Sequence, residues 1–188
     1  MYRAELIKSL KDYHERYPEE SATIERFEAF VMDEPRCFER DCWRGHVTGS
    51  AWVVNALGTH VLLTHHRKLN RWLQLGGHSD GDCDPLQIAC REAVEESGLA
   101  VEPVSGAVFD IDIHPIPARR ADPTHYHFDA RFALRSVVDE EFRVSGESHA
   151  LRWVKLDELK SVTNEPSMLR MARKWLEYDR GLAPRYGL

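Results

Sequence analysis

Apolar residues follow two different rhythms along the chain. Over residues 1–44 they stand three or four positions apart among charged residues, a spacing that predicts two amphipathic helices. Ser21 is the expected N-cap of the second helix. Packing of this N-terminal helical segment on the main domain is the favoured interpretation, and a dimerisation arm that would make a homodimer is the alternative. The spacing is carried by Leu6, Ile7, Leu10, Tyr13, Ile24, Phe27, Phe30 and Val31.

From Gly45 onward, short apolar runs are separated by turn residues, which is typical of strands. Asp84 and Pro85 predict the start of a helix, and Gly98 predicts its end. Strands that interleave with helices indicate an α/β layered domain over residues 45–188. We expect a hairpin over 50–57 and 60–64, strands near 72–75, 109–117, 125–134 and 150–156, and a last helix through 168–176.

Composition narrows the range of partners. The 188 residues carry a formal charge of −6, which argues against bulk binding of nucleic acid. No apolar run approaches about 18 residues, so we expect no membrane partner. Four cysteines are too few for a disulfide scaffold, and the charged first residues lack a signal-peptide pattern. We therefore expect reduced thiols and a cytoplasmic location.

Three carboxylates share one face of the helix that Asp84 begins. Glu92, Glu95 and Glu96 stand at i, i+3 and i+4, where like charges repel. A bound cation would relieve this repulsion, and oxygen ligands suit Mg²⁺ or, alternatively, Mn²⁺. A solvated acidic helix face is the other interpretation. We expect Leu86, Ala89, Cys90, Ala93 and Val94 to form the buried face.

The whole segment 77–99 decides between these interpretations. It matches the pattern G-x5-E-x7-R-E-U-x-E-E-x-G-U, in which U is aliphatic, at nearly all fixed positions. The departure is Cys83, which stands where the pattern has its first glutamate. The segment resembles the Nudix box of the MutT-like Nudix hydrolase superfamily, and a looser similarity extends over residues 45–158.

The resemblance implies an α/β/α sandwich with a mixed sheet, and hydrolysis of a diphosphate that is linked to another moiety. It also implies that Arg91 orients a glutamate, and that Glu147 is a further metal-binding or base residue. Glu92 would bind metal or act as the general base. The implied metal ligands are the carbonyl of Gly76 and the carboxylates of Glu92, Glu95 and Glu96. Asp80, Asp82 or Asp84 could reach the space left by the glutamate that Cys83 replaces.

Two later segments alternate polar and apolar residues with period two, so that Asp112, His114, His127 and Asp129 would share one polar face of a hairpin. We expect this face to line a substrate cleft; an exposed sheet surface is the alternative, and a second metal site is the least favoured interpretation. The expected substrate-binding residues are Arg67, Arg71, His78, His114 and His127.

The leading interpretation is a Mg²⁺-dependent pyrophosphohydrolase. Its substrate would be a nucleoside diphosphate derivative of the nucleotide-sugar, ADP-ribose or nucleoside-triphosphate type. The alternative is a non-catalytic sensor that binds a nucleotide ligand on the same fold. Retention of Arg91, Glu92, Glu95 and Glu96 favours the enzyme, whereas Cys83 favours the sensor.

Overall fold

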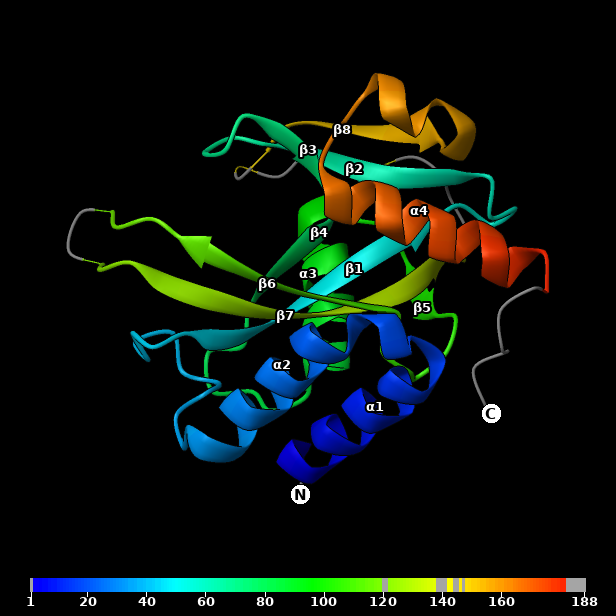
Figure 1. The fold of residues 1–188 in the computed structure, drawn as a ribbon. Helices are drawn as coiled ribbons and strands as arrows, with labels where there is room; N and C mark the ends of the chain where they lie inside the picture. The colour runs from blue at the N-terminus through cyan, green and yellow to red at the C-terminus, as the bar shows by residue number, and fades with distance from the viewer. Residues whose placement is uncertain (1, 120–121, 138–141, 144–145, 147, 182–188) are drawn as a thin grey trace.

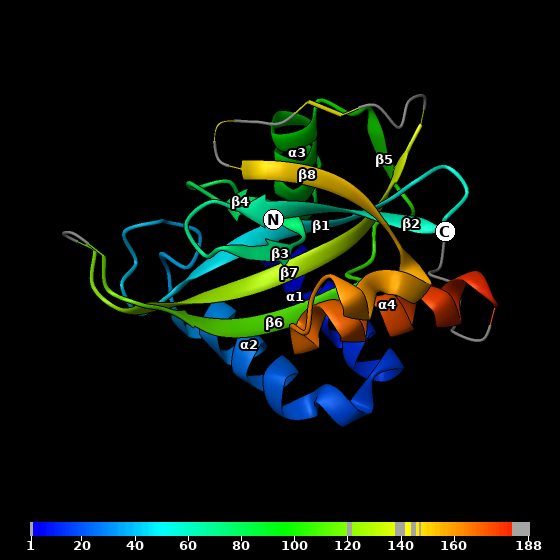
Figure 2. The ribbon, with the colours of Figure 1, turned by 90° about the horizontal axis from the view of Figure 1, so that it is seen from above.

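A mixed β-sheet with helices on both sides forms the centre of the molecule (Figures 1 and 2). The computed structural model describes residues 2–119, 122–137, 142–143, 146 and 148–181. The expected layered fold with an N-terminal helical segment is confirmed. The helices are α1 (Tyr2–Arg16), α2 (Ser21–Asp33), α3 (Pro85–Ser97) and α4 (Pro166–Asp179), with short 3₁₀ turns η1 (Pro18–Glu20) and η2 (Leu156–Ser161).

The strand order places β1 and β7 side by side at the middle of the sheet, in parallel. All the other strand pairs in the described part of the chain are antiparallel. The order is β3-β2-β1-β7-β5, and β4, β6 and β8 pair with β1, β7 and β2. The strands are β1 (His46–Val54), β2 (His60–His66), β3 (Arg71–Leu73), β4 (Leu75–His78), β5 (Val101–Pro103), β6 (Asp110–Ile116), β7 (His125–Ser136) and β8 (Ser148–Lys155).

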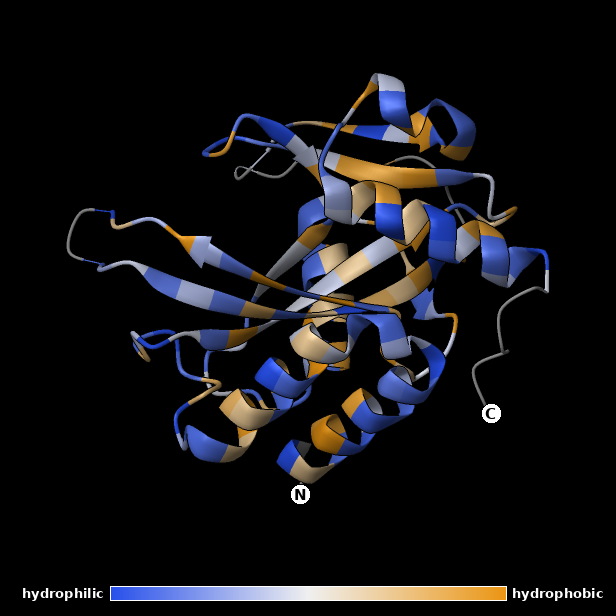
Figure 3. Cartoon of the chain, viewed as in Figure 1, coloured by the Kyte–Doolittle hydropathy of each residue, from blue (hydrophilic) through white to orange (hydrophobic). Residues whose placement is uncertain are grey.

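Helix α3 covers one face of the sheet, and α4 lies on the opposite side (Figure 2). Every residue of β1 is buried, and Gly49 allows α3 to come close to it. A Cβ atom at Gly49 would stand 2.4 Å from the Pro85 carbonyl oxygen and 2.9 Å from the Ile88 Cβ. The buried apolar residues form two clusters, one that contains Ala89 and Ala93 of α3 and one that contains Met168 and Trp175 of α4. Figure 3 shows hydrophobic residues in patches along the helices and strands.

The N-terminal helices pack on the sheet through aromatic contacts. The Phe30 ring of α2 stacks on Phe128 of β7 with 3.8 Å between ring centroids, and Phe27 meets the same ring edge-on. These three side chains belong to the apolar cluster that also contains Ala89 and Ala93 of α3. The packing expected for this segment is therefore present. The division at residues 44 and 45 stays a prediction.

Several local expectations need correction. Glu20, and not Ser21, is the N-cap of α2, and no side chain caps this helix. Val94 is exposed and Leu86 and Cys90 are half-buried, whereas Ile88, which was not expected on the buried face, is buried beside Gly49. The strand expected over 72–75 is divided into β3 and β4, and β5 was not expected.

Two other expectations concern cysteine and the membrane. The four cysteines are free thiols: Cys37 and Cys42 are buried, and Cys83 and Cys90 are half-buried. Among the helices in the described residues, none has the length and apolar character needed to cross a bilayer.

Candidate active site at the junction of strand β4 and helix α3

The start and the end of α3 are defined by local hydrogen bonds. The Asp84 carboxylate accepts hydrogen bonds from the backbone N–H groups of Leu86 and Gln87 at 3.1 and 3.3 Å, as an N-cap does. Pro85 occupies the first turn, where its missing N–H costs nothing. Gly98 ends the helix with φ of 72°, a left-handed conformation that favours glycine. The predicted helix boundaries are confirmed.

Two glutamates of α3 reach back to the glycine residues of β4. Glu96 is buried, and its Oε1 atom accepts a hydrogen bond from the Gly76 backbone N–H at 2.9 Å. The Glu92 carboxylate occupies the space beside Gly77: a Cβ atom at Gly77 would lie 2.4 Å from the Glu92 carboxyl carbon. Helix and strand are therefore held together by carboxylates at a point where the strand has no side chains.

Arg91 connects the same two elements. One of its terminal nitrogens donates to the His78 backbone carbonyl and to Glu92 Oε1, each at 3.1 Å. Its Nε atom lies 4.0 Å from Glu95 Oε1. The hydrogen bond to Glu92 raises the pKa of Arg91 above its ordinary value. Arg91 thus contacts both Glu92 and the end of β4, and the orienting role that the resemblance implies stays a prediction.

The glutamates differ in their access to solvent. The side chain of Glu95 is 63% exposed, whereas that of Glu92 is 18% exposed. The carboxylate oxygens of Glu92, Glu95 and Glu96 are donors that suit a hard cation such as Mg²⁺, as is the peptide carbonyl of Gly76. The residues present therefore fit the metal that the resemblance implies.

The loop before α3 does not bring an obvious substitute for the missing glutamate. The Cys83 side chain packs against the apolar cluster, and its Sγ lies 3.6 Å from the Gly81 carbonyl oxygen. Each nearby aspartate has a role within the loop. Asp80 pairs with Arg40 through two 2.8 Å contacts, Asp82 accepts from the Asp84 N–H, and Asp84 caps the helix.

One face of the sheet carries a layer of polar side chains, as expected from the alternation in β6 and β7. Asp112 pairs with Asp129 and His114 with His127, so these four residues share one face of the hairpin as expected. At the centre is a buried arginine that we did not anticipate, Arg131. It donates to Asp129, Asp110 and Asp112 at 2.7, 3.1 and 3.1 Å, and these carboxylates raise its pKa despite burial.

Arg131 belongs to a larger charged network that reaches α4. Arg170 and Lys174 of α4 both contact the fully buried Asp110. Burial alone would raise the pKa of Asp110, but the Arg170 hydrogen bond and the neighbouring positive charges lower it. The network balances buried charges across the sheet, which gives these residues a role in holding the fold together.

The predicted substrate-binding residues separate into two groups. His78, His114 and His127 come together: the rings of His78 and His114 lie 5.0 and 5.4 Å from the His127 ring, between centroids. Arg67 and Arg71 lie elsewhere, where β2 turns into β3, and they contact the Ser148 carbonyl and Glu165. Glu147 lies outside the described residues.

Two further histidines, His46 and His125, complete this group. The His46 ring lies 4.7 Å from that of His127 and 4.9 Å from that of His125. The alternation in β7 placed His125 and His127 on one face, but His46 precedes the expected first strand and carried no such signal. Burial lowers the pKa of His46 and His78 to about 4, and that of His127 to about 2.

Comparison with known proteins agrees with this geometry. The family described as NUDIX domain matches residues 46–176, which include both the glycine strand and α3. The chain belongs to the Nudix family. A comparison with curated proteins found no match.

Solved structures of Nudix proteins have the same fold. A Nudix-family hydrolase from Clostridium perfringens is 27% identical with a TM-score of 0.53, covering 71% of this chain and 97% of that one. An Ap4A hydrolase from C. elegans, 16% identical, has a TM-score of 0.53 and covers 72% and 98% of the two chains. The dihydroneopterin triphosphate pyrophosphohydrolase of E. coli, 16% identical, has a TM-score of 0.55 and covers 68% and 92%. The family match and the C. perfringens hydrolase confirm the expectation of a hydrolase.

Proposed function

We propose that this Nudix protein is a Mg²⁺-dependent pyrophosphohydrolase that cleaves a nucleoside diphosphate linked to another moiety. The observation that carries the proposal is the junction of β4 and α3. There Glu96 holds the Gly76 N–H, Glu92 occupies the space beside Gly77, and Arg91 holds both Glu92 and the His78 carbonyl. This arrangement keeps the carboxylates next to a bare strand, where a polyphosphate can approach the backbone closely.

Each residue of the junction has a proposed task. Glu92, Glu95, Glu96 and the Gly76 carbonyl would hold the metal, and Arg91 positions Glu92. When bound, the metal neutralises phosphate charge and lowers the pKa of a water molecule so that it can attack phosphorus. Without a cation, the carboxylates of α3 would repel a polyphosphate. Glu92, already fixed by Arg91, is our candidate for the residue that accepts the proton of the attacking water.

The polar sheet face supports a substrate position beside this junction. His78 ends β4 and therefore lies between the glycines and the other histidines. We propose His78, His114 and His127 as residues that border the substrate, with Arg67 and Arg71 as outer phosphate contacts. Nucleotide sugars, ADP-ribose and nucleoside triphosphates are the candidate substrates. The free thiols support a cytoplasmic location.

A panel of these nucleotides, assayed for phosphate and monophosphate release with Mg²⁺, Mn²⁺ or chelator, tests the proposal. We expect metal-dependent turnover of at least one compound. The double variant Glu95→Gln plus Glu96→Gln should lower kcat by at least about 100-fold, because neutral amides bind Mg²⁺ weakly. Glu158→Gln, an exposed glutamate on η2, is the matched control and should keep full activity.

The sensor alternative has its own result in the same experiment. If the wild type and the double variant both bind a nucleotide but neither releases product with any metal, the protein is a ligand sensor and the enzymatic proposal is wrong. Calorimetry with the same nucleotides measures that binding.

A further inference from the structure

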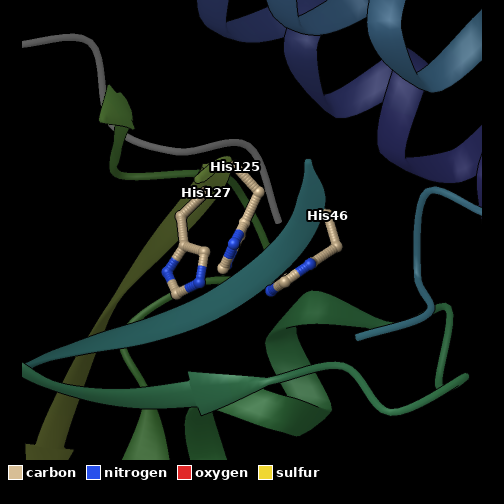
Figure 4. Close-up of side chains that lie close together, drawn as sticks. All are labelled: His46, His125 and His127. Carbon is tan, nitrogen blue, oxygen red and sulfur yellow. The ribbon is translucent and has the colours of Figure 1, made fainter. Parts of the chain in front are cut away.

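Three histidines from two central strands place their rings together at one end of the sheet. His46 is the first residue of β1, and His125 and His127 lie two positions apart on β7 (Figure 4). His46 and His127 are cross-strand partners in the parallel pair. One ring nitrogen from each residue can be chosen so that all three atoms lie within 4.8 Å of one another. The group is distinct from the carboxylates of α3 both in position and in ligand chemistry.

The ring nitrogens of this group lack the hydrogen bonds that buried polar atoms normally have. His46 is 1% exposed, and neither its Nδ1 nor its Nε2 atom has a hydrogen-bond partner among the described residues. The Cys42 backbone lies near this ring and favours its protonation weakly, without completing a hydrogen bond. The buried Nε2 of His127 also lacks a partner in the described structure. Orphaned buried nitrogens in a group of three histidines whose ring nitrogens lie within 4.8 Å of one another call for a ligand.

The third histidine is oriented by a backbone carbonyl. His125 is buried, and its Nδ1 lies 2.9 Å from the Pro123 carbonyl oxygen. A carbonyl only accepts, so Nδ1 carries the proton and Nε2 presents a lone pair. A histidine whose second nitrogen donates to a carbonyl is the usual arrangement in protein metal sites, because the hydrogen bond fixes both the tautomer and the ring direction.

The electrostatics of the group favour a metal over a phosphate. His46 is 1% exposed and the Nε2 atom of His127 is buried, so burial disfavours a positive charge on either ring. An uncharged imidazole is a good ligand for a borderline transition metal and lacks the positive charge that attracts a phosphate. The nearest carboxylate along β7, Asp129, is already held by Thr48, Ser50 and Arg131.

We propose that His46, His125 and His127 bind one Zn²⁺ ion, with the fourth position open to water. Nitrogen atoms around tetrahedral zinc lie about 3.3 Å apart, given Zn–N distances near 2.0–2.1 Å. Because the chosen nitrogens lie within 4.8 Å of one another, each ring needs to move by at most about 1 Å on binding, which small side-chain rotations achieve. The site joins the start of β1 to the start of β7.

The ion would also stabilise the end of β4, because the His78 ring packs against two of the proposed ligands. The His78 ring lies 5.1 Å from that of His46 and 5.0 Å from that of His127, between centroids. The backbone carbonyl of His78 is the group that Arg91 binds. Zinc at the three histidines would thus restrict the strand that carries Gly76 and Gly77, while itself remaining outside the carboxylate site.

Metal titration of the wild-type protein is the first test. After removal of metals by a chelator, Zn²⁺ is titrated in competition with a chromophoric chelator, and Co²⁺ is used as an optical probe. We expect one Zn²⁺ per chain, the visible d–d absorption of Co²⁺ bound to nitrogen ligands, and a rise in Tm. Absence of stoichiometric Zn²⁺ binding in the wild type would overturn the proposal.

Variants locate the ion. His127→Gln and His46→Gln should each weaken Zn²⁺ binding by at least about tenfold and remove the Zn²⁺-dependent rise in Tm. His149→Gln, at an exposed histidine on β8, is the control and should bind like the wild type. The double variant Glu95→Gln plus Glu96→Gln should also bind Zn²⁺ normally. If that double variant loses Zn²⁺ and the histidine variants retain it, the ion belongs to the carboxylates and the proposal is wrong.

Imidazole spectra of the wild type give a result that does not depend on whether a variant folds. In nitrogen-15 spectra of the histidine rings, one equivalent of Zn²⁺ should shift the metal-facing nitrogens of His46, His125 and His127, while those of His60 and His149 stay in place. Unchanged resonances for the first three would overturn the proposal.

Discussion

At the scale of single residues, the candidate active site depends on a glycine, which leaves room for a carboxylate because it has no side chain. Gly77 has no Cβ, and the carboxylate of Glu92 lies where that atom would be. Arg91 fixes the carboxylate from the other side. The glycine is required by close approach, since its backbone does not adopt a positive φ angle. The position of Glu92 is therefore set jointly by a strand and by its own helix.

Replacing this glycine should affect catalysis more than stability. Gly77→Ala would push the Glu92 carboxylate aside, and because a side chain can yield, we expect at least a tenfold loss in kcat with a fall in Tm of only a few degrees. Nucleotide turnover and thermal unfolding measure the two effects.

Two other glycines provide the comparison. Gly106→Ala should change neither quantity, because nothing lies within 4 Å of the added methyl group. Gly49→Ala meets the Pro85 backbone carbonyl instead, so it should lower Tm more than Gly77→Ala does. Equal activity of Gly77→Ala and the wild type would show that the position of Glu92 is not important for turnover.

The residues of the junction could be predicted from the sequence because they lie in one short segment with fixed spacing. Arg91, Glu92 and Glu96 all contact β4 within 20 positions along the chain. The histidine group could not be predicted in the same way. His46 and His127 are brought together by strand pairing, and the neighbour of a strand is not encoded in its own periodicity.

At the scale of elements, local sequence signals define both ends of helix α3. Its cap, its first-turn proline and its C-terminal glycine are all visible in the sequence and all present in the structure. The second helix lacks such a cap, and its predicted start was wrong by one residue for that reason. Local hydrogen bonds make boundaries predictable, whereas boundaries set by packing are not.

Removal of the α3 cap should destabilise the protein without removing any proposed ligand. Asp84→Ala loses two hydrogen bonds to backbone N–H groups, so the free energy of unfolding should fall by about 1 kcal/mol. Urea denaturation measures the change. Asp12→Ala, at an exposed position within α1, should have an effect below about 0.5 kcal/mol. A loss at Asp84 no larger than that at Asp12 would contradict this role of the cap.

The strands show which features of a sheet can be predicted from the alternation of polar and apolar residues. Long alternating segments predicted β6 and β7 and their shared polar face, whereas the pairing of individual residues is seen only in the structure. The short β5 has only three residues and no alternation to detect. The expected hairpin of β1 and β2 is joined at Val54 and Val61, but β1 then pairs with β7 and β2 with β8. Those pairings depend on contacts that are distant in sequence.

At the scale of the whole molecule, buried charge and buried imidazole make stability depend on pH. The folded state lowers the pKa of His46 to about 4 and that of His127 to about 2. An unfolded histidine titrates near 6.5, so the unfolded chain binds more protons below that pH. The stability from neutral imidazoles is complete above about pH 6.5 and is lost as the pH falls through the folded values. Asp110 and Asp112, whose pKa values are also lowered, add a second loss below about pH 4.

We therefore expect the metal-free protein to lose stability steadily between about pH 6.5 and 4. A single histidine with a fully lowered pKa contributes a slope of at most about 1.4 kcal/mol per pH unit. Urea midpoints measured across this range test the prediction.

Variants show which histidine causes the change of stability with pH. His127→Gln should flatten the decline, since glutamine does not titrate, whereas His149→Gln should leave it unchanged. The charged neighbours Arg40 and Asp80 act on His46 in opposite directions and are present in both variants. A profile that is flat in the wild type, or equally steep in His127→Gln, would contradict this account.

The parallel pairing of β1 with β7 also determines when the histidine group can form. Thr48 and Asp129, two positions along from His46 and His127, are 81 positions apart in the chain. Contacts between such distant residues close a long loop, which makes folding slow. The three imidazoles therefore meet only late, when the centre of the sheet is nearly complete. An ion that needs all three would leave the folding rate almost unchanged and would slow the unfolding rate instead.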